Sequence, residues 1–270
     1  METPGVLRWS DAGDLAIGDT VFRVGRRRTA QDESPLDGRF RLKRDRGAIE
    51  QLAQLVAGLR PRNIVELGIL EGAGSAFFAE LAQPQKLVAI DLRTIPVDRF
   101  EQWVESRGLR EVVRTYYGVD QTDAAALRRI VADEFAAQPL DLVVDDASYY
   151  VEAKRASFNA LFPHLRPGGI YLIDHWSRDH MFEVAVSTDP VAQEQIQDVI
   201  GDTSRVRRPP ITVLLFELVL ACAYSPELVE EISIHDRWAA VARGNRSVDA
   251  DEFDISTCYG KGGRRLVNGL

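Results

Sequence analysis

Residues 62–92 read RNIVELGILEGAGSAFFAELAQPQKLVAIDL and hold the pattern from which the rest of the fold follows. Two short runs rich in Val, Ile and Leu, at Asn63–Gly68 and Lys86–Leu92, flank a helix-forming stretch at Gly72–Ala82. A strand, a helix and a second strand in this order are typical of a βαβ unit with parallel strands. The first run is apolar without alternation, which predicts a strand covered on both faces.

The same rhythm continues along the chain. Further strands are predicted at 112–119, 140–146 and 169–175, and helices at 44–59, 97–107, 122–137 and 151–165. Residues 211–224 form a buried helix or strand, and only a tight turn fits between the strands at 228–234 and 237–243, so these two pair antiparallel. The sequence therefore predicts an α/β fold, a doubly wound Rossmann-like sheet of seven strands, mostly parallel with a C-terminal antiparallel hairpin.

The predicted sheet defines the boundaries of the chain's parts. Residues 1–43 are rich in Gly, Asp and Arg without a helical or strand period, so we expect an arm or lid, or a solvated tail, and no core element. Residues 44–245 form the main domain. Within it, residues 176–210 are polar and form a long loop, and residues 246–270 form a polar C-terminal tail.

The composition of the chain excludes some classes of binding partner. The chain has 270 residues, with 33 Lys and Arg against 41 Asp and Glu, a net charge of -8. An acidic protein is repelled by a polyanionic backbone, so nucleic acid is not expected as a partner. The two cysteines show no metal-ligand spacing and are expected to be reduced thiols. No apolar run is long enough for a membrane helix or a leader, so we expect a cytoplasmic protein.

Acidic side chains end several of the predicted strands, where open parallel sheets bind ligands. The first strand leads into a glycine-rich turn, Glu66 to Ser75, in which Gly68 and Gly72 are four residues apart, unlike the dinucleotide-binding G-x-G-x-x-G. Asp91 ends the second strand, 23 residues beyond Gly68, where a carboxylate can accept both hydroxyls of a ribose.

The third strand is followed by Asp120 and Gln121. Their carboxylate and amide either bind the exocyclic amine of an adenine, or Asp120 caps the helix that begins after it. The two interpretations stay open at the level of sequence.

These features in this order resemble the class I S-adenosylmethionine-dependent methyltransferases, over roughly residues 63–243. The match consists of E-x-G-x-x-x-G at Glu66, Gly68 and Gly72, the ribose acid Asp91 and the closing hairpin. The resemblance implies S-adenosylmethionine as cosubstrate, and a binding set that consists of Glu66, Gly68, Gly72, Ser75, Asp91, Asp120 and Asp145. Asp145 either belongs to this set or orients its loop.

Residues 143–176, VVDDASYYVEAKRASFNALFPHLRPGGIYLIDHW, are similar to the branch that contains macrolide-sugar and rhamnosyl O-methyltransferases and cephalosporin-hydroxylase-like proteins. That branch has D-D-G-S-H and a later E-D pair, which hold a divalent metal, and its His is the catalytic base. Here Asp146, Asp174 and His175 fall on the metal ligands, and Tyr149 falls on the base. The resemblance implies a Mg or Mn site, although imidazole suits Mn, Fe or Zn better than Mg.

The resemblance implies an O-methyltransferase that acts on a hydroxyl of a small acceptor, a sugar or a glycosylated secondary metabolite. We assign catalytic roles to Asp146, Tyr149 and His175, and we expect a homo-oligomer by resemblance alone. The departures at Tyr149 and His175 leave open a catalytically altered accessory or binding protein. Trp176 either walls an acceptor pocket or fills a gap, and Arg207 and Arg208 either contact an anionic acceptor or stay solvated.

Overall fold

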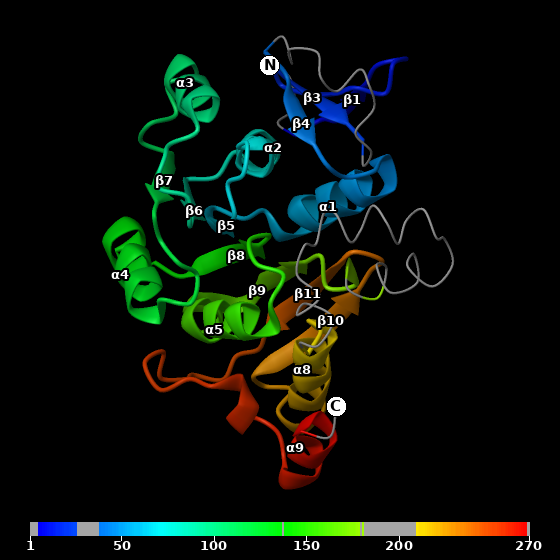
Figure 1. The fold of residues 1–270 in the computed structure, drawn as a ribbon, viewed down its shortest axis with the longest axis vertical. Helices are drawn as coiled ribbons and strands as arrows, with labels where there is room; N and C mark the ends of the chain where they lie inside the picture. The colour runs from blue at the N-terminus through cyan, green and yellow to red at the C-terminus, as the bar shows by residue number, and fades with distance from the viewer. Residues whose placement is uncertain (1–4, 26–37, 137, 179, 181–208, 269–270) are drawn as a thin grey trace, which may run out of the picture. The chain divides into compact units, whose positions relative to one another are not determined.

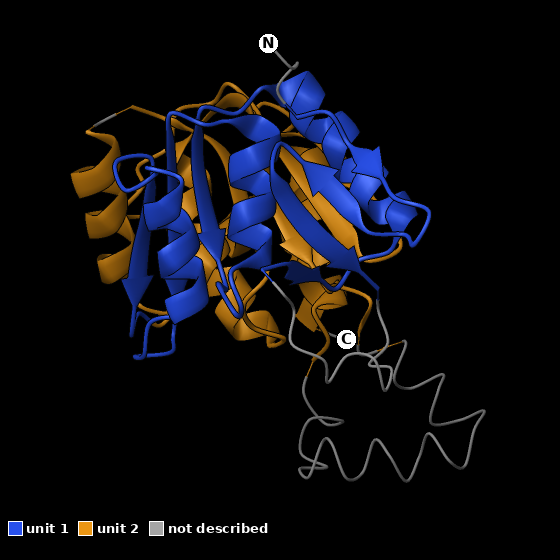
Figure 2. Ribbon diagram, turned by 90° about the horizontal axis from the view of Figure 1, so that it is seen from above, with its two compact units in different colours: residues 1–119 blue, residues 120–270 orange. Residues whose placement is uncertain are grey.

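A computed structural model describes residues 5–25, 38–136, 138–178, 180 and 209–268. The chain divides into two compact units, residues 1–119 and residues 120–270 (Figure 2). Each unit is built from alternating strands and helices, as Figure 1 shows by the labels along the chain.

The first unit begins with a small four-stranded sheet in the order β1-β2-β3-β4. Its strands β1 to β3 pair antiparallel and β3 pairs β4 in parallel. The bounds are β1 Arg8–Trp9, β2 Leu15–Ile17, β3 Thr20–Val24 and β4 Phe40–Leu42. At most 3% of each of the five side chains Leu15, Ile17, Phe22, Phe40 and Leu42 is exposed.

The prediction that residues 1–43 contain no core element is therefore wrong for the described part of this segment. The strands are only two to five residues long, so each shows too little alternation to register as a period. Aromatic packing joins this sheet to the helices that follow: Phe22 packs edge-on against Phe77, with ring centroids 6.2 Å apart, and Phe40 packs against Trp103 at 5.7 Å. The basic cluster Arg26–Arg28 lies outside the described residues.

The remainder of the first unit follows the predicted order. Its elements are α1 Arg46–Leu59, β5 Asn63–Leu67, α2 Ala73–Ala82, β6 Lys86–Asp91, α3 Asp98–Ser106 and β7 Val113–Tyr117. Strands β5, β6 and β7 pair in parallel. Helix α1 begins where the Asp45 carboxylate accepts a hydrogen bond from the Ala48 amide at 2.9 Å, a side-chain N-cap.

The second unit contains the other four strands of the main sheet. Its elements are α4 Ala124–Phe135, β8 Leu140–Asp145, α5 Val151–Leu161, β9 Leu165–Asp174, α8 Thr212–Tyr224, β10 Val229–Ile234, β11 Trp238–Arg243 and α9 Lys261–Asn268. Residues 211–224, left open between helix and strand by the sequence, are helical. Strands β8 and β9 are parallel, while β11 pairs antiparallel with both β9 and β10. The predicted hairpin is confirmed.

The seven strands have the order β10-β11-β9-β8-β5-β6-β7, which confirms the predicted fold class. The predicted boundaries differ by four residues between α5 and β9, because α5 ends at Leu161 and a short 3-10 turn, Phe162–His164, leads directly into β9 at Leu165. The predicted polar tail is also wrong in part. Phe253, Ile255, Tyr259 and Val267 are buried, and the Phe253 ring stacks on Phe162 with centroids 5.9 Å apart.

Candidate functional site

The glycine-rich turn between β5 and α2 has a backbone conformation that requires glycine. Gly68 and Gly72 have φ angles of 99° and 82°, in the left-handed region that favours glycine. A Cβ at Gly72 would lie 2.5 Å from Cγ of Phe100, so a side chain has no room there. The spacing of these two glycines thus reflects a close approach between this turn and α3.

The Asp91 carboxylate secures the turn from the end of β6. Its Oδ2 accepts hydrogen bonds from the amides of Ile69 at 2.8 Å and Leu70 at 3.0 Å, and its Oδ1 accepts one from the Arg93 amide at 2.8 Å. A carboxylate offers about four lone-pair sites, so these amides take most of its capacity. In this geometry Asp91 has capacity for one more donor, where the sequence predicted two ribose hydroxyls.

Glu66 and Ser75 contact each other. The Ser75 hydroxyl donates to Glu66 Oε2, and both side chains are buried. A Cβ at Gly74 would lie 2.2 Å from Glu66 Oε1, which explains a third glycine in the turn. The carboxylate therefore sits against the first turn of α2, where the helix dipole favours a negative charge.

Three apolar side chains near Asp91 are exposed, and the sequence reasoning missed them. The exposed fractions are 51% for Leu70, 65% for Leu92 and 75% for Ile95. Leu70 belongs to the glycine-rich turn, and the other two follow β6. Exposed apolar side chains that gather at a strand end are typical of a surface that binds a flat, apolar group. In the sequence, Leu92 directly after Asp91 at the end of the strand was the signal that could have revealed this apolar surface.

In the second unit, Asp145 is fully buried and forms an ion pair. Its Oδ1 lies 2.9 Å from Nζ of Lys154, which also donates to the Asp145 carbonyl oxygen at 2.6 Å. Its Oδ2 accepts from the hydroxyls of Ser157 at 2.7 Å and Tyr171 at 2.9 Å. These contacts engage the Asp145 carboxylate inside the unit and favour the interpretation that it orients its loop, while its assignment to the cosubstrate site stays a prediction. Burial raises the pKa of Tyr171 well above its usual value, and the negative charge of Asp145 raises it further.

Gln121 joins the same buried network. Its amide nitrogen donates to the Ser157 hydroxyl at 3.0 Å, and its amide oxygen accepts from the Ser148 amide at 2.8 Å. The amide is thus engaged within the unit and holds the loop that follows β8. Asp120 is exposed and accepts from the amide and hydroxyl of Thr122, both at 2.8 Å, a local turn. The helix cap itself is Asp123.

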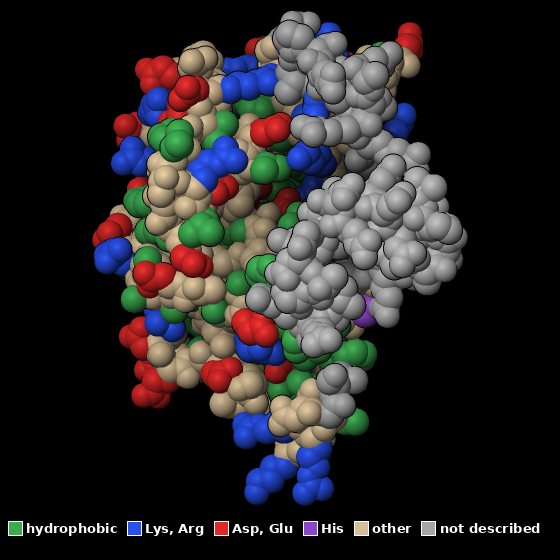
Figure 3. Space-filling model, in the orientation of Figure 1, with side chains coloured by type: hydrophobic (Ala, Val, Ile, Leu, Met, Phe, Trp, Pro, Cys, Tyr) green, Lys and Arg blue, Asp and Glu red, His purple; other side chains and the backbone are tan. Residues whose placement is uncertain are grey.

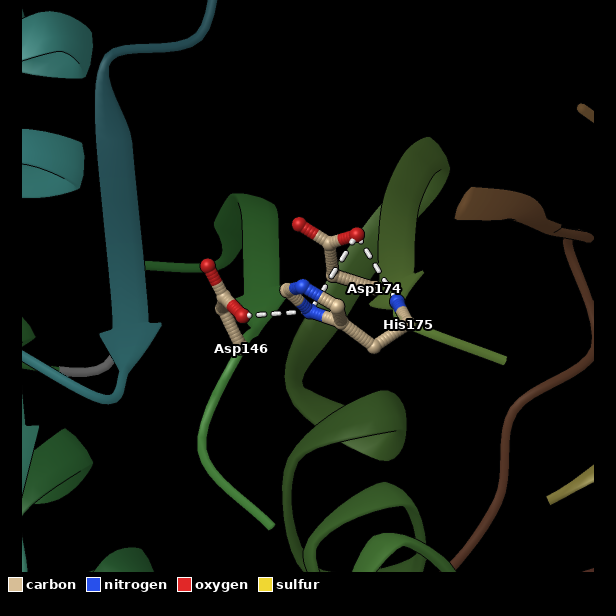
Figure 4. A group of neighbouring side chains, drawn as sticks. All are labelled: Asp146, Asp174 and His175. Atoms are coloured by element: carbon tan, nitrogen blue, oxygen red, sulfur yellow. Dashed lines mark hydrogen bonds and ion pairs between the residues drawn. The ribbon is translucent and has the colours of Figure 1, made fainter. Parts of the chain in front are cut away.

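Asp146, Asp174 and His175 come together at the ends of β8 and β9 (Figure 4). Nδ1 of His175 lies 2.9 Å from Asp146 Oδ1 and 3.6 Å from Asp174 Oδ1. One ligand atom from each residue lies within 4.8 Å of the other two, a spacing that a divalent ion with ligands at about 2.0–2.6 Å can bridge. Two carboxylates and one imidazole fit Mn, Fe or Zn most closely. The predicted set is brought together by the fold.

The backbone of His175 is unusual. Its φ is 61°, in the left-handed region that a residue with a Cβ rarely adopts. The His175 amide donates to Asp174 Oδ1 at 2.7 Å, which helps to hold this conformation. The strained residue turns the chain at the end of β9 so that the imidazole faces Asp146, and strain of this kind clusters at functional sites.

Tyr149 borders the cluster. Its ring meets the His175 ring edge-on with centroids 5.5 Å apart, and the Arg178 guanidinium lies 3.6 Å from its centroid. Burial raises the pKa of Tyr149, the Arg178 charge opposes this, and Asp146 and Asp174 add to it. The phenol therefore stays protonated at neutral pH and acts as a hydrogen-bond donor more readily than as a base.

Other histidine and tryptophan side chains have structural contacts. The Trp176 indole N–H donates to the His235 carbonyl at 2.8 Å, which ties the end of β9 to the hairpin turn. His180 Nε2 lies 2.5 Å from the Thr212 hydroxyl. Burial lowers the pKa of His164, and the nearby Arg128 charge lowers it further, so this imidazole is uncharged at neutral pH. Arg207 and Arg208 lie outside the described residues.

The order of the seven strands and the helices between them define a Rossmann-like α/β fold. Residues 65–176 match the family model of a methyltransferase domain. The match extends from β5 to the residue after His175, so it includes both the glycine-rich turn and the Asp146 cluster. No helix among the described residues is both long enough and apolar enough to cross a membrane.

The curated relatives that the chain matches are named as O-methyltransferases. The mycinamicin VI 2''-O-methyltransferase of Micromonospora griseorubida is 50% identical over 66 residues, which are 24% of this chain and 16% of that protein. A tetracenomycin-C rhamnosyl 3'-O-methyltransferase of Streptomyces olivaceus is 36% identical over 126 residues, 44% of this chain and 29% of that protein. The matched segments thus span less than a third of these relatives.

Solved structures show the same fold. MycE, a methyltransferase from the mycinamycin biosynthetic pathway solved with Mg and SAH, superposes with a TM-score of 0.51 and 22% identity, over 82% of this chain and 53% of that chain. Another MycE structure, with Mg, SAH and mycinamycin VI, gives a TM-score of 0.50 and 23% identity, over 75% of this chain and 50% of that chain. The chain spans about half the length of MycE.

Proposed function

We propose that this protein is an S-adenosylmethionine-dependent O-methyltransferase that transfers a methyl group to a hydroxyl of a small acceptor, a sugar or a glycosylated secondary metabolite. The observation that carries the proposal is the cluster of Asp146, Asp174 and His175 inside a segment that matches the methyltransferase family. The named relatives act on sugar hydroxyls, which supports the choice of acceptor. A cytoplasmic location and a homo-oligomeric state stay predictions.

The first unit is proposed to bind the cosubstrate. The turn around Gly68 and Gly72 leads into the N-terminus of α2, where backbone amides and the helix dipole favour a ligand, and Asp91 accepts one ribose hydroxyl with its remaining lone pair. The exposed side chains of Leu70 and Leu92 contact the adenine. Solved MycE contains SAH, which supports this assignment.

The second unit is proposed to bind and activate the acceptor. Asp146, Asp174 and His175 would hold a divalent ion, which when bound orients the acceptor hydroxyl and lowers its pKa. Without an ion, the same imidazole is the base, because the Asp146 carboxylate, 2.9 Å from Nδ1, orients the ring. In either case the carbon–sulfur bond of the cosubstrate breaks as the carbon–oxygen bond forms, and the hydroxyl proton leaves.

Tyr149 is proposed to position the acceptor through its phenolic O–H. We expect Tyr149→Phe to raise the acceptor KM while the pH dependence of kcat is unchanged below pH 9, because the raised pKa keeps the phenol neutral there. If kcat of the wild type instead rises with pH above pH 9 and this rise is lost in the variant, Tyr149 is the base.

Calorimetric titration with S-adenosylhomocysteine tests the cosubstrate, with NAD as the control ligand and with Mg, Mn or EDTA added in turn. Micromolar binding of the nucleoside and no binding of NAD support the proposal. An acceptor screen with Asp146→Asn and the exposed control Asp120→Asn then tests the second unit. If neither nucleoside binding nor turnover is detected, the protein is an accessory or binding protein that keeps the fold.

A further inference from the structure

Helix α8 exposes an apolar face although it lies within the second unit. Exposed fractions are 49% for Phe216, 45% for Val219 and 57% for Tyr224, and Ala223 is also exposed. Their spacing of three and four residues places them on one side of the helix. We call this surface, Phe216, Val219, Ala223 and Tyr224, the α8 face.

The α8 face carries no charge. The helix contains one charged residue, Glu217, which is 3% exposed and turned inward. Its Oε2 accepts from Nε of Arg155 at 2.8 Å and its Oε1 accepts from the Tyr259 hydroxyl at 3.0 Å. A helix that is apolar on its outer side as well as its inner side is expected to be covered.

The two flanks of the α8 face bear opposite charges. On one side lies β10, the edge strand of the sheet, since Cys222 Sγ is 3.8 Å from the Glu230 carbonyl oxygen. This strand exposes Glu230 and Glu231.

On the other side lies α9. A Cβ on Gly263 would be 3.1 Å from Leu220, and one on Gly260 would be 2.9 Å from Tyr224. Helix α9 exposes Lys261, Arg264 and Arg265. In Figure 3, Lys and Arg side chains gather at the lower end, where Figure 1 labels α9, with hydrophobic side chains above them.

Both flanks lie beside the C-terminal half of α8, because the contacts that place them fall at residues 220–224. In a two-fold dimer whose axis runs parallel to α8, the β10 flank of one copy faces the α9 flank of the other. Each acidic strand then meets a basic helix, and the two apolar faces meet at the axis. An axis perpendicular to α8 would instead bring like charges together, which is unfavourable.

We propose that the α8 face is a homodimer interface, in which α8 packs beside α8 of a second copy and β10 of each copy faces α9 of the other. A uniformly acidic partner is repelled by Glu230 and Glu231, and a uniformly basic one by α9. A second copy bears both signs in complementary places. Backbone pairing between β10 edges is disfavoured by the bulge at Val229–Glu231 and by the adjacent glutamates.

Sedimentation velocity of the full chain from 1 to 100 µM tests the interface. The wild type is expected to dimerise reversibly and to dissociate as salt is raised, because screening weakens the charged flanks. Phe216→Glu places two carboxylates near the axis and is expected to be monomeric at 100 µM. Val6→Glu alters another apolar side chain, 50% exposed and far from α8 in the sequence, and is the matched control that keeps the wild-type state.

Charge reversal separates the proposed arrangement from other dimers. Glu230→Lys with Glu231→Lys, or Lys261→Glu with Arg265→Glu, is expected to raise the dimer Kd at least tenfold. All four changes together are expected to return the dimer Kd to within about threefold of the wild-type value, because the flanks are again complementary. A monomeric wild type at 100 µM, a dimer that survives Phe216→Glu, or a fourfold variant no tighter than the double variants would overturn the proposal. Far-UV circular dichroism checks that each variant is folded.

Discussion

Lys154→Met leaves the buried Asp145 carboxylate without its cation. The side chains of Lys154 and Asp145 are 1% and 0% exposed and lie 2.9 Å apart, so water cannot replace the lost charge. Removing one partner of a buried ion pair costs about 3–5 kcal/mol. Ser157 and Tyr171 still donate to Oδ2, so we expect the lower end of this range. Even about 3 kcal/mol is a large part of a typical unfolding free energy of roughly 5–15 kcal/mol.

Urea unfolding followed by far-UV circular dichroism measures this loss. The midpoint should fall while the slope with urea is unchanged, since the exposed surface is the same. Arg46→Met is the matched control, because Arg46 and Glu50 also form an ion pair at 2.7 Å, but with side chains 63% and 44% exposed. Such a pair is worth about 0.3–0.5 kcal/mol.

A double variant completes the cycle. Asp145→Asn with Lys154→Met removes both charges, and we expect it to be more stable than Lys154→Met alone, because no unpaired charge is left in the interior. If Lys154→Met lies within about 1 kcal/mol of the wild type, the reasoning that the pair is shielded from solvent is wrong.

Three further predictions concern single positions. Gly74→Ala forces a Cβ against Glu66 Oε1, so we expect about 1–3 kcal/mol of lost stability in urea unfolding, and an unchanged midpoint would contradict it. Asp91→Ala should weaken S-adenosylhomocysteine binding by about 1.5–3 kcal/mol in calorimetry, and unchanged affinity would remove Asp91 from the cosubstrate site. Burial lowers the pKa of His164, so the unfolded chain takes up its proton first, and stability falls as pH drops below about 6.5. His164→Gln should lose this pH dependence in urea midpoints measured from pH 7.5 to pH 5.

The main sheet could be predicted from the sequence because its strands are buried on both faces. Runs such as residues 142–144, in which every residue is apolar and buried, produce an apolar signal that needs no tertiary context. The sheet β1–β4 has no such signal. Leu15 and Ile17 are fully buried, but they stand in a strand of three residues, and only the packing of Phe22 and Phe40 on α2 and α3 makes them core residues.

The resemblance to the O-methyltransferase branch singled out Asp146, Asp174 and His175, which the fold brings together, but the separate roles of adjacent residues could not be predicted. Asp145 and Asp146 are neighbours in sequence, yet the first is fully buried and the second has a side chain 27% exposed. Successive side chains of a strand point to opposite faces, so only one of the two can face α5, where Lys154 lies. The sequence alone predicts that adjacent side chains point to opposite faces, but not which of the two faces the helix.

That division of roles connects the interior to the proposed chemistry. Lys154 holds the Asp145 carbonyl, and Gln121 holds the Ser148 amide, so the peptide segment that carries Asp146 is fixed on both sides. Asp146 in turn orients His175. Lys154→Met should therefore lower kcat or metal affinity at temperatures where the protein is still folded, while S-adenosylhomocysteine, proposed to bind the first unit, keeps its affinity. An equal loss of nucleoside affinity would mean that the variant unfolds globally and that the buried pair does not position Asp146 in particular.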